Sequence, residues 1–291
     1  MKEIVILSGK GGTGKTSISA SFAHLEGTQA AIADCDVDAS DLHLLLKPTV
    51  KTSEEFYGGY EAVIEPDGCI GCGICMDSCH FDAIFPVESV FKVDPIRCEG
   101  CGLCAHVCPK KVITMEDALS GDIFFSETRF NSPMVHAKLG IGAENSGKLV
   151  AKVKEEVKAL AKKHNKSTII VDGSPGIGCP VVSSLSDADF VVLVTEPSIS
   201  GIHDLKRVHD LVRRFHIPSG VIINKADINP KNTKELNNYL ATHFITKLAE
   251  IPYSDSFPKS LTNRQTLIEW GDEEISQILR DAWNKVKSLT Q

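Results

Sequence analysis

Short apolar runs recur along the chain, each bounded by turn residues or by an aspartate. They are rich in valine, isoleucine and alanine and lie at residues 3–7, 30–33, 167–171, 190–194 and 220–223. Continuous apolar runs of this length predict strands that are buried on both faces of a parallel sheet. Helix-compatible patterns separate them at residues 17–24, 148–163 and 203–215. Strands that alternate with helices predict an α/β fold with a doubly wound, mostly parallel sheet.

Residues 62–116 break this rhythm because they are rich in cysteine and glycine and repeat internally. The run Cys-Ile-Gly-Cys-Gly-Ile-Cys that starts at Cys69 recurs as Cys-Glu-Gly-Cys-Gly-Leu-Cys from Cys98. A duplicated unit inserted between the second and third predicted strands accounts for this repeat. We therefore predict two domains, one formed by residues 1–61 and 117–291 and an inserted one formed by residues 62–116.

Composition narrows the range of functions. The 291 residues carry a formal net charge of −7 at pH 7, so no overall basic field would attract nucleic acid or anionic lipid. No uninterrupted apolar run approaches 18 residues, and the N-terminal stretch lacks the pattern of a signal peptide. We expect a cytoplasmic protein that binds neither nucleic acid nor membrane. In such a chain, ten cysteines favour metal or redox chemistry over disulfides.

Residues 9–16 read Gly-Lys-Gly-Gly-Thr-Gly-Lys-Thr, directly after a predicted strand and before a predicted helix. This is the P-loop pattern in the context that it requires. Its glycines let backbone N–H groups surround phosphate oxygens, and the helix N-terminus adds a positive dipole end. We expect Lys15 at the β- and γ-phosphates and the Thr16 hydroxyl on Mg²⁺. The nucleotide-binding residues predicted in this loop are Gly11, Gly12, Thr13, Gly14, Lys15 and Thr16.

Lys10, an additional lysine early in this loop, gives the motif a more particular character. The loop resembles the deviant Walker A box of the MinD/ParA family, also labelled CobQ/CobB/MinD/ParA. That resemblance implies an ATP-hydrolysing homodimer in which Lys10 reaches across to the nucleotide of the partner subunit. A role for Lys10 within its own subunit, attracting phosphate, is the alternative.

Two acidic segments resemble further motifs of the same family. Asp172 ends the third predicted strand, before a Pro/Gly turn, and resembles the Walker B and switch II aspartate. The resemblance implies that Asp172 holds Mg²⁺ through water. Asp36 follows the second predicted strand in a segment that resembles switch I, where it would orient the attacking water, with Asp38 as the weaker candidate. The catalytic residues expected on this basis are Lys10, Lys15 and Asp36.

The end of the fifth predicted strand resembles the base-binding segment of P-loop proteins. There the Asn224 amide would contact the purine, although the spelling Asn-Lys-x-Asp also resembles the guanine box of GTPases. We expect ATP, because the P-loop and switches resemble those of an adenine-using family. By the same resemblance, Pro252 and its neighbours would close over the base from the opposite side.

The inserted segment holds two cysteine runs with the spacing of bacterial two-cluster ferredoxins. In that arrangement, three close thiolates hold one 4Fe–4S cluster and the fourth cysteine of the run reaches the other cluster. Cys79 is followed by His80 where such proteins usually have proline. Zinc rarely uses eight thiolates in two such runs. We assign one cluster to Cys69, Cys72, Cys75 and Cys108, and the other to Cys98, Cys101, Cys104 and Cys79.

Nearly the whole chain resembles MinD-superfamily ATPases that contain an inserted ferredoxin domain. The function expected from this resemblance is a nucleotide-driven dimer switch coupled to electron transfer toward an unidentified protein partner. Two alternatives stay open: ATP-dependent assembly or delivery of clusters or a metal cofactor, and a positioning ATPase that cycles on a surface. The apolar periodicity of residues 275–289 predicts a docked terminal helix rather than a membrane anchor.

Cys179 lies seven residues after Asp172, the spacing at which the nitrogenase iron protein carries one ligand of a dimer-bridging cluster. A complete bridging cluster is not expected, because residues 120–147 contain no cysteine to supply the second ligand. Two interpretations of Cys179 stay open: a structural residue, or a thiol near the two-fold axis that meets a transferred cluster or a partner.

Overall fold

The computed structural model describes residues 1–38, 40–140, 142 and 146–290. Within these residues, nine strands form one sheet in the order β11-β10-β9-β1-β8-β2-β7-β6-β3. Neighbouring strands from β11 to β7 pair in parallel. Strand β6 pairs antiparallel with both β7 and β3. The predicted α/β fold with a large, mostly parallel sheet is therefore confirmed.

The predicted strands are present with ends that move by no more than one residue, and they form the buried centre of the sheet. They are β1 (Lys2–Ser8), β2 (Ala30–Asp34), β8 (Thr168–Asp172), β9 (Phe190–Thr195) and β10 (Ser219–Ile223). One edge strand, β11 (Thr246–Glu250), was not predicted, and four of its five residues are not buried. The continuous apolar runs are explained by helices that cover both faces of the sheet.

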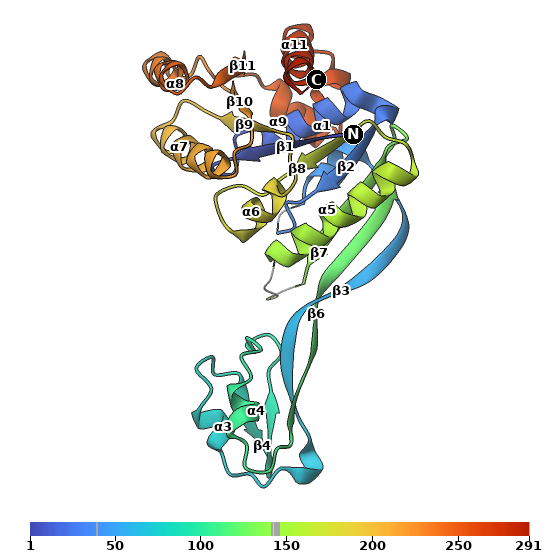
Figure 1. Ribbon diagram of the computed structural model, residues 1–291, viewed down its shortest axis with the longest axis vertical. Coiled ribbons are helices and arrows are strands. Elements are labelled where there is room, and N and C mark those ends of the chain that lie inside the picture. Colours follow the sequence, from blue (N-terminus) through green and yellow to red (C-terminus); the bar gives the residue numbers. More distant parts are fainter. Residues whose placement is uncertain (39, 141, 143–145, 291) are drawn as a thin grey trace.

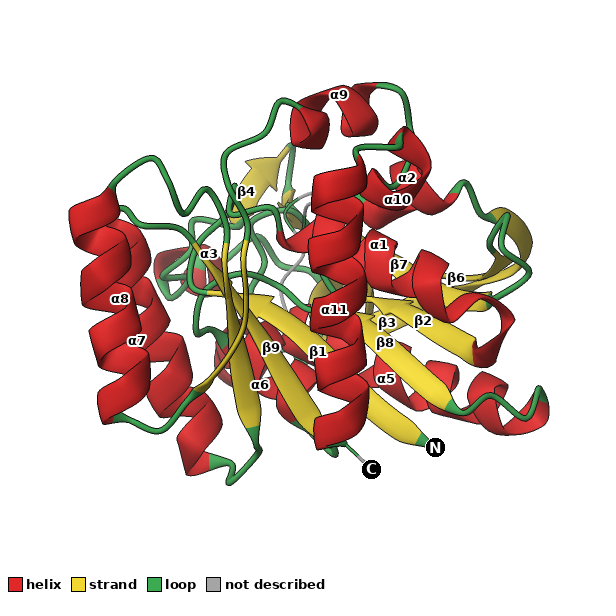
Figure 2. Ribbon diagram, turned by 90° about the horizontal axis from the view of Figure 1, so that it is seen from above, coloured by secondary structure: helices red, strands yellow, loops and turns green. Residues whose placement is uncertain are grey.

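Helices pack on the two faces of the sheet and enclose two hydrophobic cores (Figure 2). One face carries α5 (Ser146–Lys163), α6 (Cys179–Leu185), α7 (Ile199–Arg214) and α8 (Pro230–Thr242). The other carries α1 (Lys15–Glu26), α2 (Leu42–Leu46), α9 (Ser256–Thr262), α10 (Leu267–Trp270) and α11 (Glu273–Leu289). The helices predicted at residues 17–24, 148–163 and 203–215 are thus confirmed, and α7 starts earlier because Ser198 caps it.

Strands β3 (Thr49–Ile64) and β6 (Ile113–Glu127) extend far beyond the rest of the sheet. Strand β7 (Pro133–Leu139) pairs with β6 only from Gly121 onward, so β3 and β6 continue alone as a two-stranded ribbon. Eight residues of β-strand, from 57 to 64, span about 26 Å. Figure 1 shows this ribbon leaving the sheet and carrying a small lobe at its far end.

The lobe contains α3 (Ile74–Asp77), β4 (Ile84–Val87), β5 (Val90–Val93) and α4 (Leu103–Val107). Short 3₁₀ turns lie at Gly27–Gln29 in the body and Pro66–Gly68 in the lobe. The lobe has a hydrophobic cluster of its own, separate from the two cores of the body, formed by Ala62, Ile64, Cys75, Ile84, Phe91 and Ile113. The boundaries predicted at residues 62 and 116 fall inside β3 and β6, which run from the body into the lobe without interruption.

The ribbon is fastened where it leaves the sheet. The β3–β6 register shifts there in both strands, around Gly58 and Ser120. The Ser120 hydroxyl accepts a hydrogen bond from the Gly58 N–H at 3.2 Å, and Lys148 Nζ of α5 donates to the Gly58 carbonyl at 3.1 Å. A Cβ atom at residue 58 would lie 2.6 Å from the Phe56 ring, so a larger residue in this bulge would force that ring to move.

The C-terminal helix α11 is docked on the body, as the periodicity of residues 275–289 predicted. Trp283 is buried, stacks on Phe22 with ring centroids 4.8 Å apart, and donates through Nε1 to Glu26 at 2.9 Å. Among the described residues, no helix has both the length and the apolar character needed to cross a membrane.

Candidate functional site

The P-loop joins β1 to α1 at the carboxyl edge of the sheet. Gly14 has φ of +92° and stands at the N-cap of α1, a backbone conformation that favours glycine. A Cβ atom at this position would lie 2.6 Å from the Asn224 amide nitrogen. The glycine therefore lets the loop pass close beneath the segment that follows β10.

Lys15 lies at the centre of a buried polar cluster. Its Nζ is 2.9 Å from Oδ1 of Asp172 and 3.5 Å from Oδ2 of Asp36, and the Thr16 hydroxyl donates to Oδ2 of Asp172 at 2.9 Å. Burial lowers the pKa of Lys15, but Asp172 and Asp36 outweigh that effect and raise it above its usual value. The structure thus brings together four residues that three separate motifs predicted.

This cluster carries surplus negative charge. Asp34 is buried beside Asp172, accepts from the Ser40 hydroxyl at 2.6 Å and accepts from the Asp36 N–H at 3.1 Å. Burial, together with the nearby Asp172, raises the pKa of Asp34 to about 7. Three carboxylates therefore surround one ammonium, and oxygen donors of this kind suit Mg²⁺. The residues present fit a magnesium-bound nucleotide.

A pocket opens above the P-loop. Its walls are formed by residues 11–17, by Asp36, Asp41, Pro175, Asn224 and Lys225, and by a segment after β11. Tyr253, Phe257 and Pro258 of that segment line the pocket, and Pro252 is not among its lining residues in the described chain. Asp38 lines a neighbouring pocket with His43 and His136. Of the two switch I candidates, only Asp36 faces the P-loop pocket.

The segment after β10 is held by its own hydrogen bonds. Asn224 donates through Nδ2 to the Thr13 carbonyl at 2.8 Å and accepts from the Lys225 N–H at 2.9 Å. Oδ1 of Asp227 accepts from the Tyr253 N–H at 2.6 Å, so this carboxylate fixes the loop that carries Tyr253. Asp227 does not line the pocket within the described residues. Because Asp227 binds the Tyr253 N–H and lies outside the pocket lining, the geometry supports an adenine site over the guanine-box interpretation.

Lys10 turns away from the pocket toward β9. Its Nζ lies 2.5 Å from Oε1 of Glu196 and 3.2 Å from the Ser198 hydroxyl. Glu196 also accepts from Lys225 Nζ at 2.7 Å through its other oxygen. Sequence reasoning missed Glu196, although it directly follows a strand that pairs with β1, the strand preceding the P-loop.

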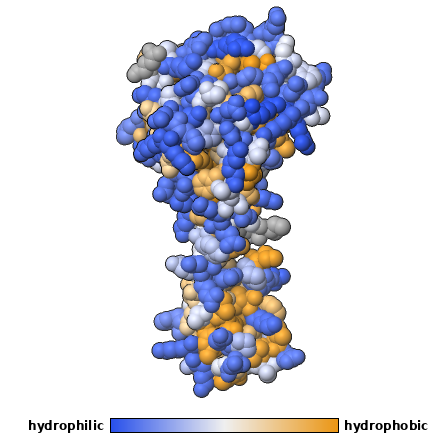
Figure 3. Space-filling model, turned by 90° about the vertical axis from the view of Figure 1, so that its right-hand side faces the viewer, coloured by the Kyte–Doolittle hydropathy of each residue, from blue (hydrophilic) through white to orange (hydrophobic). Residues whose placement is uncertain are grey.

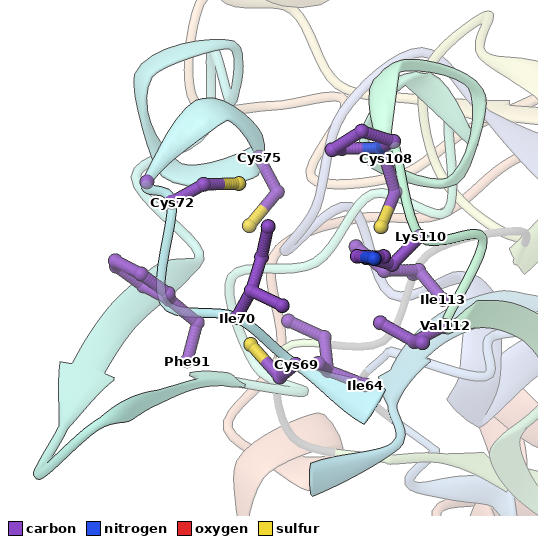
Figure 4. A pocket seen from close by; sticks show the side chains of 12 residues that line it. Ile64, Cys69, Ile70, Cys72, Cys75, Phe91, Cys108, Lys110, Val112 and Ile113 are labelled. Carbon is purple, nitrogen blue, oxygen red and sulfur yellow. The ribbon is translucent and has the colours of Figure 1, made fainter. Parts of the chain in front are cut away.

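The eight cysteines of the lobe lie in two groups of four. One pocket is lined by Cys69, Cys72, Cys75 and Cys108, together with apolar residues such as Ile64 and Phe91. Figure 4 shows the sulfur atoms of Cys69, Cys72 and Cys75 on one side and that of Cys108 on the other. The other pocket is lined by Cys79, Cys98, Cys101 and Cys104. Each pocket therefore combines three cysteines of one run with the last cysteine of the other.

The two cysteine pockets are alike in size. Each has a cavity volume of about 20 Å³. Among the described residues, no three His, Cys, Asp or Glu side chains are close enough to share a single metal ion.

The two remaining cysteines differ in exposure. Cys35, between Asp34 and Asp36 in the sequence, is fully buried. Burial raises the pKa of its thiol, so it stays a neutral core residue. Cys179 is exposed at the start of α6, with its Cβ 3.0 Å from the Cβ position that a side chain at residue 147 would occupy.

Comparison with known proteins agrees with this geometry. The family model of the CobQ/CobB/MinD/ParA nucleotide binding domain matches residues 4–267. The chain belongs to this family. Uncharacterized protein MJ0578 of Methanocaldococcus jannaschii is 34% identical over 290 residues, which are 99% of this chain and 97% of that protein. Family membership makes this MinD/ParA-type chain a P-loop ATPase.

Solved structures share the fold of this MinD/ParA-type ATPase. The septum site-determining protein MinD of Pyrococcus horikoshii, complexed with Mg-ADP, aligns with a TM-score of 0.59 and 17% identity, covering 99% of this chain and 96% of that one. McdA of Cyanothece in complex with ATP aligns with a TM-score of 0.60 and 14% identity, with the same two coverages.

Proposed function

We propose that this ATPase is an iron–sulfur protein in which a nucleotide-driven homodimer switch controls electron transfer through two 4Fe–4S clusters. The observation that carries the proposal is the crossed grouping of the eight cysteines in two pockets of nearly equal size. Crossed sets of three plus one are the ligand pattern of two-cluster ferredoxins. We accordingly assign residues 62–116 to a ferredoxin-like domain carried on the β3–β6 ribbon.

The donor sets fit this cofactor. Cys69, Cys72, Cys75 and Cys108 would hold one cluster, and Cys98, Cys101, Cys104 and Cys79 the other. Thiolates that hold a multi-iron cluster are spread over its corners, so each set combines three cysteines of one run with one of the other. A bound 4Fe–4S cluster supplies one-electron storage. Apolar side chains between the thiols limit the access of water to that site.

The nucleotide face supplies the other half of the proposal. Lys15 and Thr16 would hold the phosphates and Mg²⁺ of ATP, with Asp172 holding Mg²⁺ through water and Asp36 orienting the attacking water. The surplus negative charge of the buried aspartates supports Mg²⁺ at this place. Asn224 would contact the base. The fold shared with MinD complexed with Mg-ADP and McdA complexed with ATP supports the same nucleotide placement.

Helix α5 is the proposed link between the nucleotide face and the ribbon. At its N-terminus, Gly147 packs against Cys179, the first residue of α6, which follows the switch II segment. The next residue, Lys148, holds the root of the ribbon through the Gly58 carbonyl. A movement of α6 on nucleotide exchange would therefore reach the ribbon through one helix end. Coupling requires that the two arrangements differ in nucleotide affinity.

The test is the iron content of cysteine variants purified and reconstituted without oxygen. About eight irons per chain are expected for the wild type, and about four for Cys108→Ser and for Cys79→Ser. EPR spectra of the reduced variants should then show the signal of the one cluster that each variant retains, and this cluster should differ between the two variants. Zinc in place of iron, or identical spectra from the two variants, would refute the ligand assignment.

Delivery of clusters or of a metal cofactor is the second candidate. It is favoured by the exposure of Cys72 and Cys101, one in each pocket, at the end of a projecting ribbon. An iron balance separates the two functions, because delivery moves protein-bound iron to the acceptor whereas electron transfer changes only the oxidation state. A Cys179→Ser variant that kept ATPase rate and iron but lost transfer would assign this thiol to delivery, and unchanged transfer would leave it structural.

Surface positioning is the candidate that the fold neighbours favour, since they include a septum site-determining protein. The lobe also exposes apolar side chains, which gather on the face seen in Figure 3. The exposed apolar side chains of the lobe as a whole, without regard to face, include Ile70, Ile74, Phe81, Phe85 and Ile96. Flotation of the protein with anionic liposomes and ATP decides between the two uses of this face. Flotation that depends on ATP would support positioning, and its absence would support a protein partner.

A further inference from the structure

Glu196 stands at the meeting point of three segments of the nucleotide face. It follows β9 directly and binds Lys10 through one carboxylate oxygen and Lys225 through the other, at 2.5 Å and 2.7 Å. The side chain of Glu196 is 15% exposed, and those of Lys10 and Lys225 are 28% and 31% exposed. Burial would raise the pKa of Glu196, but the two lysines outweigh that effect and hold it below its usual value. The group is therefore an anion at neutral pH.

The backbone around Glu196 leaves its carboxylate little freedom. Gly201 of α7 packs so tightly on the Glu196 carbonyl that a Cβ atom there would lie 2.3 Å from the oxygen. Ser198 caps α7 by accepting a hydrogen bond from the Gly201 N–H at 3.0 Å. Its hydroxyl oxygen also accepts a hydrogen bond from Lys10 Nζ at 3.2 Å. Lys225 in turn donates to the Gly12 carbonyl at 3.2 Å. Glu196 is thus tied to both ends of the segment from residue 10 to residue 12.

We propose that Glu196 is a positioning residue that retains Lys10 within its own subunit until the nucleotide of a partner subunit competes for it. The proposal rests on the homodimer given under Proposed function and on the role of Lys10 in trans that the family resemblance implies. In the structure, the Lys10 ammonium is occupied by a fixed carboxylate of its own chain. To contact phosphate across an interface it must exchange that carboxylate for another anion, so the ion pair with Glu196 opposes dimer formation.

The symmetry of a two-fold dimer doubles this effect. Each protomer would release one Lys10, so the factor by which one ion pair weakens dimerisation enters twice. A partly exposed pair of this kind changes an equilibrium by roughly three-fold. Removing both pairs should therefore lower the dimer dissociation constant about ten-fold.

The test is sedimentation equilibrium of Glu196→Gln and wild type at saturating Mg²⁺ and a non-hydrolysable ATP analogue. We expect the dimer dissociation constant of Glu196→Gln to be about ten-fold lower than that of wild type. With ADP, both proteins should remain monomeric. Glu196→Asp keeps the charge and should stay close to wild type. Adding Lys10→Ala to Glu196→Gln should return the dissociation constant to that of Lys10→Ala alone.

Glu250→Gln is the matched control. It makes the same change in net charge at a carboxylate that binds Lys247 at 2.6 Å and Asn237 at 2.8 Å, away from the P-loop pocket. It should dimerise like wild type. Glu196→Gln also removes the partner of Lys225, which lines the P-loop pocket. Titration of each monomer with a fluorescent ATP analogue measures the nucleotide affinity by itself, so an effect through Lys225 is distinguished from an effect on the dimer equilibrium.

Two further outcomes would overturn the proposal in different ways. If wild type dimerises with the analogue and Glu196→Gln has the same or a higher dissociation constant, Glu196 does not restrain Lys10, and the homodimer stands. If neither protein dimerises at any concentration reached, both the restraint and the homodimer switch fail. Dimerisation of Glu196→Gln alone would support the restraint in its strongest form.

Discussion

At the scale of single residues, the two cysteine pockets differ mainly in the charge beside them. Lys110 lines the pocket of Cys69, Cys72, Cys75 and Cys108, whereas Glu99 lines the other. A nearby positive charge stabilises the reduced, more negative form of a cluster and raises its reduction potential. If the proposed clusters are bound, Lys110→Gln should lower the potential of the one held by Cys69, Cys72, Cys75 and Cys108. Glu99→Gln should raise that of the other, each change being on the order of 20 mV.

Redox titration followed by EPR checks this prediction. The matched control is Lys92→Gln, a lysine in β5 that lines neither pocket among the described residues. Strand β3 runs from the body to the lobe, so Ala62 lies closer to the body along this strand than Ile64 does. Ala62 lines the pocket that contains Glu99, and Ile64 lines the pocket that contains Lys110. The pocket of Glu99 is therefore the nearer of the two to the body. The expected order of potentials thus directs electrons outward. Shifts in the opposite directions would reverse that order.

His136 gives the protein a predictable pH dependence. Burial, assisted by the neighbouring His43, lowers its pKa from 6.5 to about 4. The other groups that face its ring are Phe124, with centroids 5.1 Å apart, and the Ser126 hydroxyl, 3.0 Å from Nε2. Between pH 6.5 and 4, the unfolded chain binds a proton here that the native chain does not. The unfolding free energy should therefore fall as the pH falls through this range, by at most about 3 kcal/mol.

Urea denaturation of wild type and His136→Asn at pH 7, 6, 5 and 4 measures this contribution. Other groups titrate in the same range, so the informative quantity is the difference between the two proteins. The unfolding free energy of wild type minus that of His136→Asn should decrease steadily from pH 7 to pH 4. A difference that does not change with pH would show that His136 titrates alike in both states.

A sequence motif predicts the functional residues that lie within it. It does not predict residues such as Glu196 that contact the motif only in the folded chain. Lys15, Thr16, Asp36 and Asp172 were predicted because each occupies a fixed place relative to the end of a strand, and parallel strands bring such ends together. Glu196 has no such motif. It lies 186 positions from Lys10 along the chain, and the pairing of β1 with β9 brings the two together.

At the scale of elements, the ribbon is what the sequence could not predict. Most of β3 is exposed up to Tyr57, so no alternation of apolar and polar positions marks it as a strand. Its length is sustained by pairing with β6 along almost its whole extent, a long-range interaction that a local pattern does not encode. The central strands were predictable because both of their faces are buried and their apolar runs are continuous.

The root of this ribbon should loosen when its contact with α5 is removed. Lys148→Ala deletes one hydrogen bond, from Nζ to the Gly58 carbonyl, worth about 1 kcal/mol. We expect amide exchange in residues 57–60 and 118–121 to become about five-fold faster, with the cores of the body unchanged. Hydrogen exchange with mass spectrometry measures this. Lys152→Ala is the control, because Lys152 lies on the same helix and, in the described part of the chain, forms its ion pairs with Glu155 and Glu156. Equal rates in all three proteins would mean that the β3–β6 pairing alone holds the root.

At the scale of the whole molecule, the nucleotide pocket and the cysteine pockets are separate sites. Among the residues that the structure describes, none lines both kinds of pocket, and the ribbon of about 26 Å stands between the body and the lobe. A nucleotide in the P-loop pocket therefore cannot act by contact on a group bound in either cysteine pocket. Any influence must pass through an element that both sites bias, and the described chain offers α5, which contacts α6 and the ribbon root.

This separation makes the dependence of the clusters on nucleotide a test of the whole arrangement. Reduced protein should give EPR spectra and potentials that differ between the nucleotide-free, ADP-bound and ATP-analogue-bound states, because movement of the lobe changes the solvent exposure of the clusters. In Lys148→Ala the differences should shrink, while the iron content and the affinity for the analogue stay at wild-type values. Identical spectra in all three states of wild type would favour delivery of clusters over gated electron transfer. Differences that persist in Lys148→Ala would place the coupling outside the contact between α5 and the ribbon.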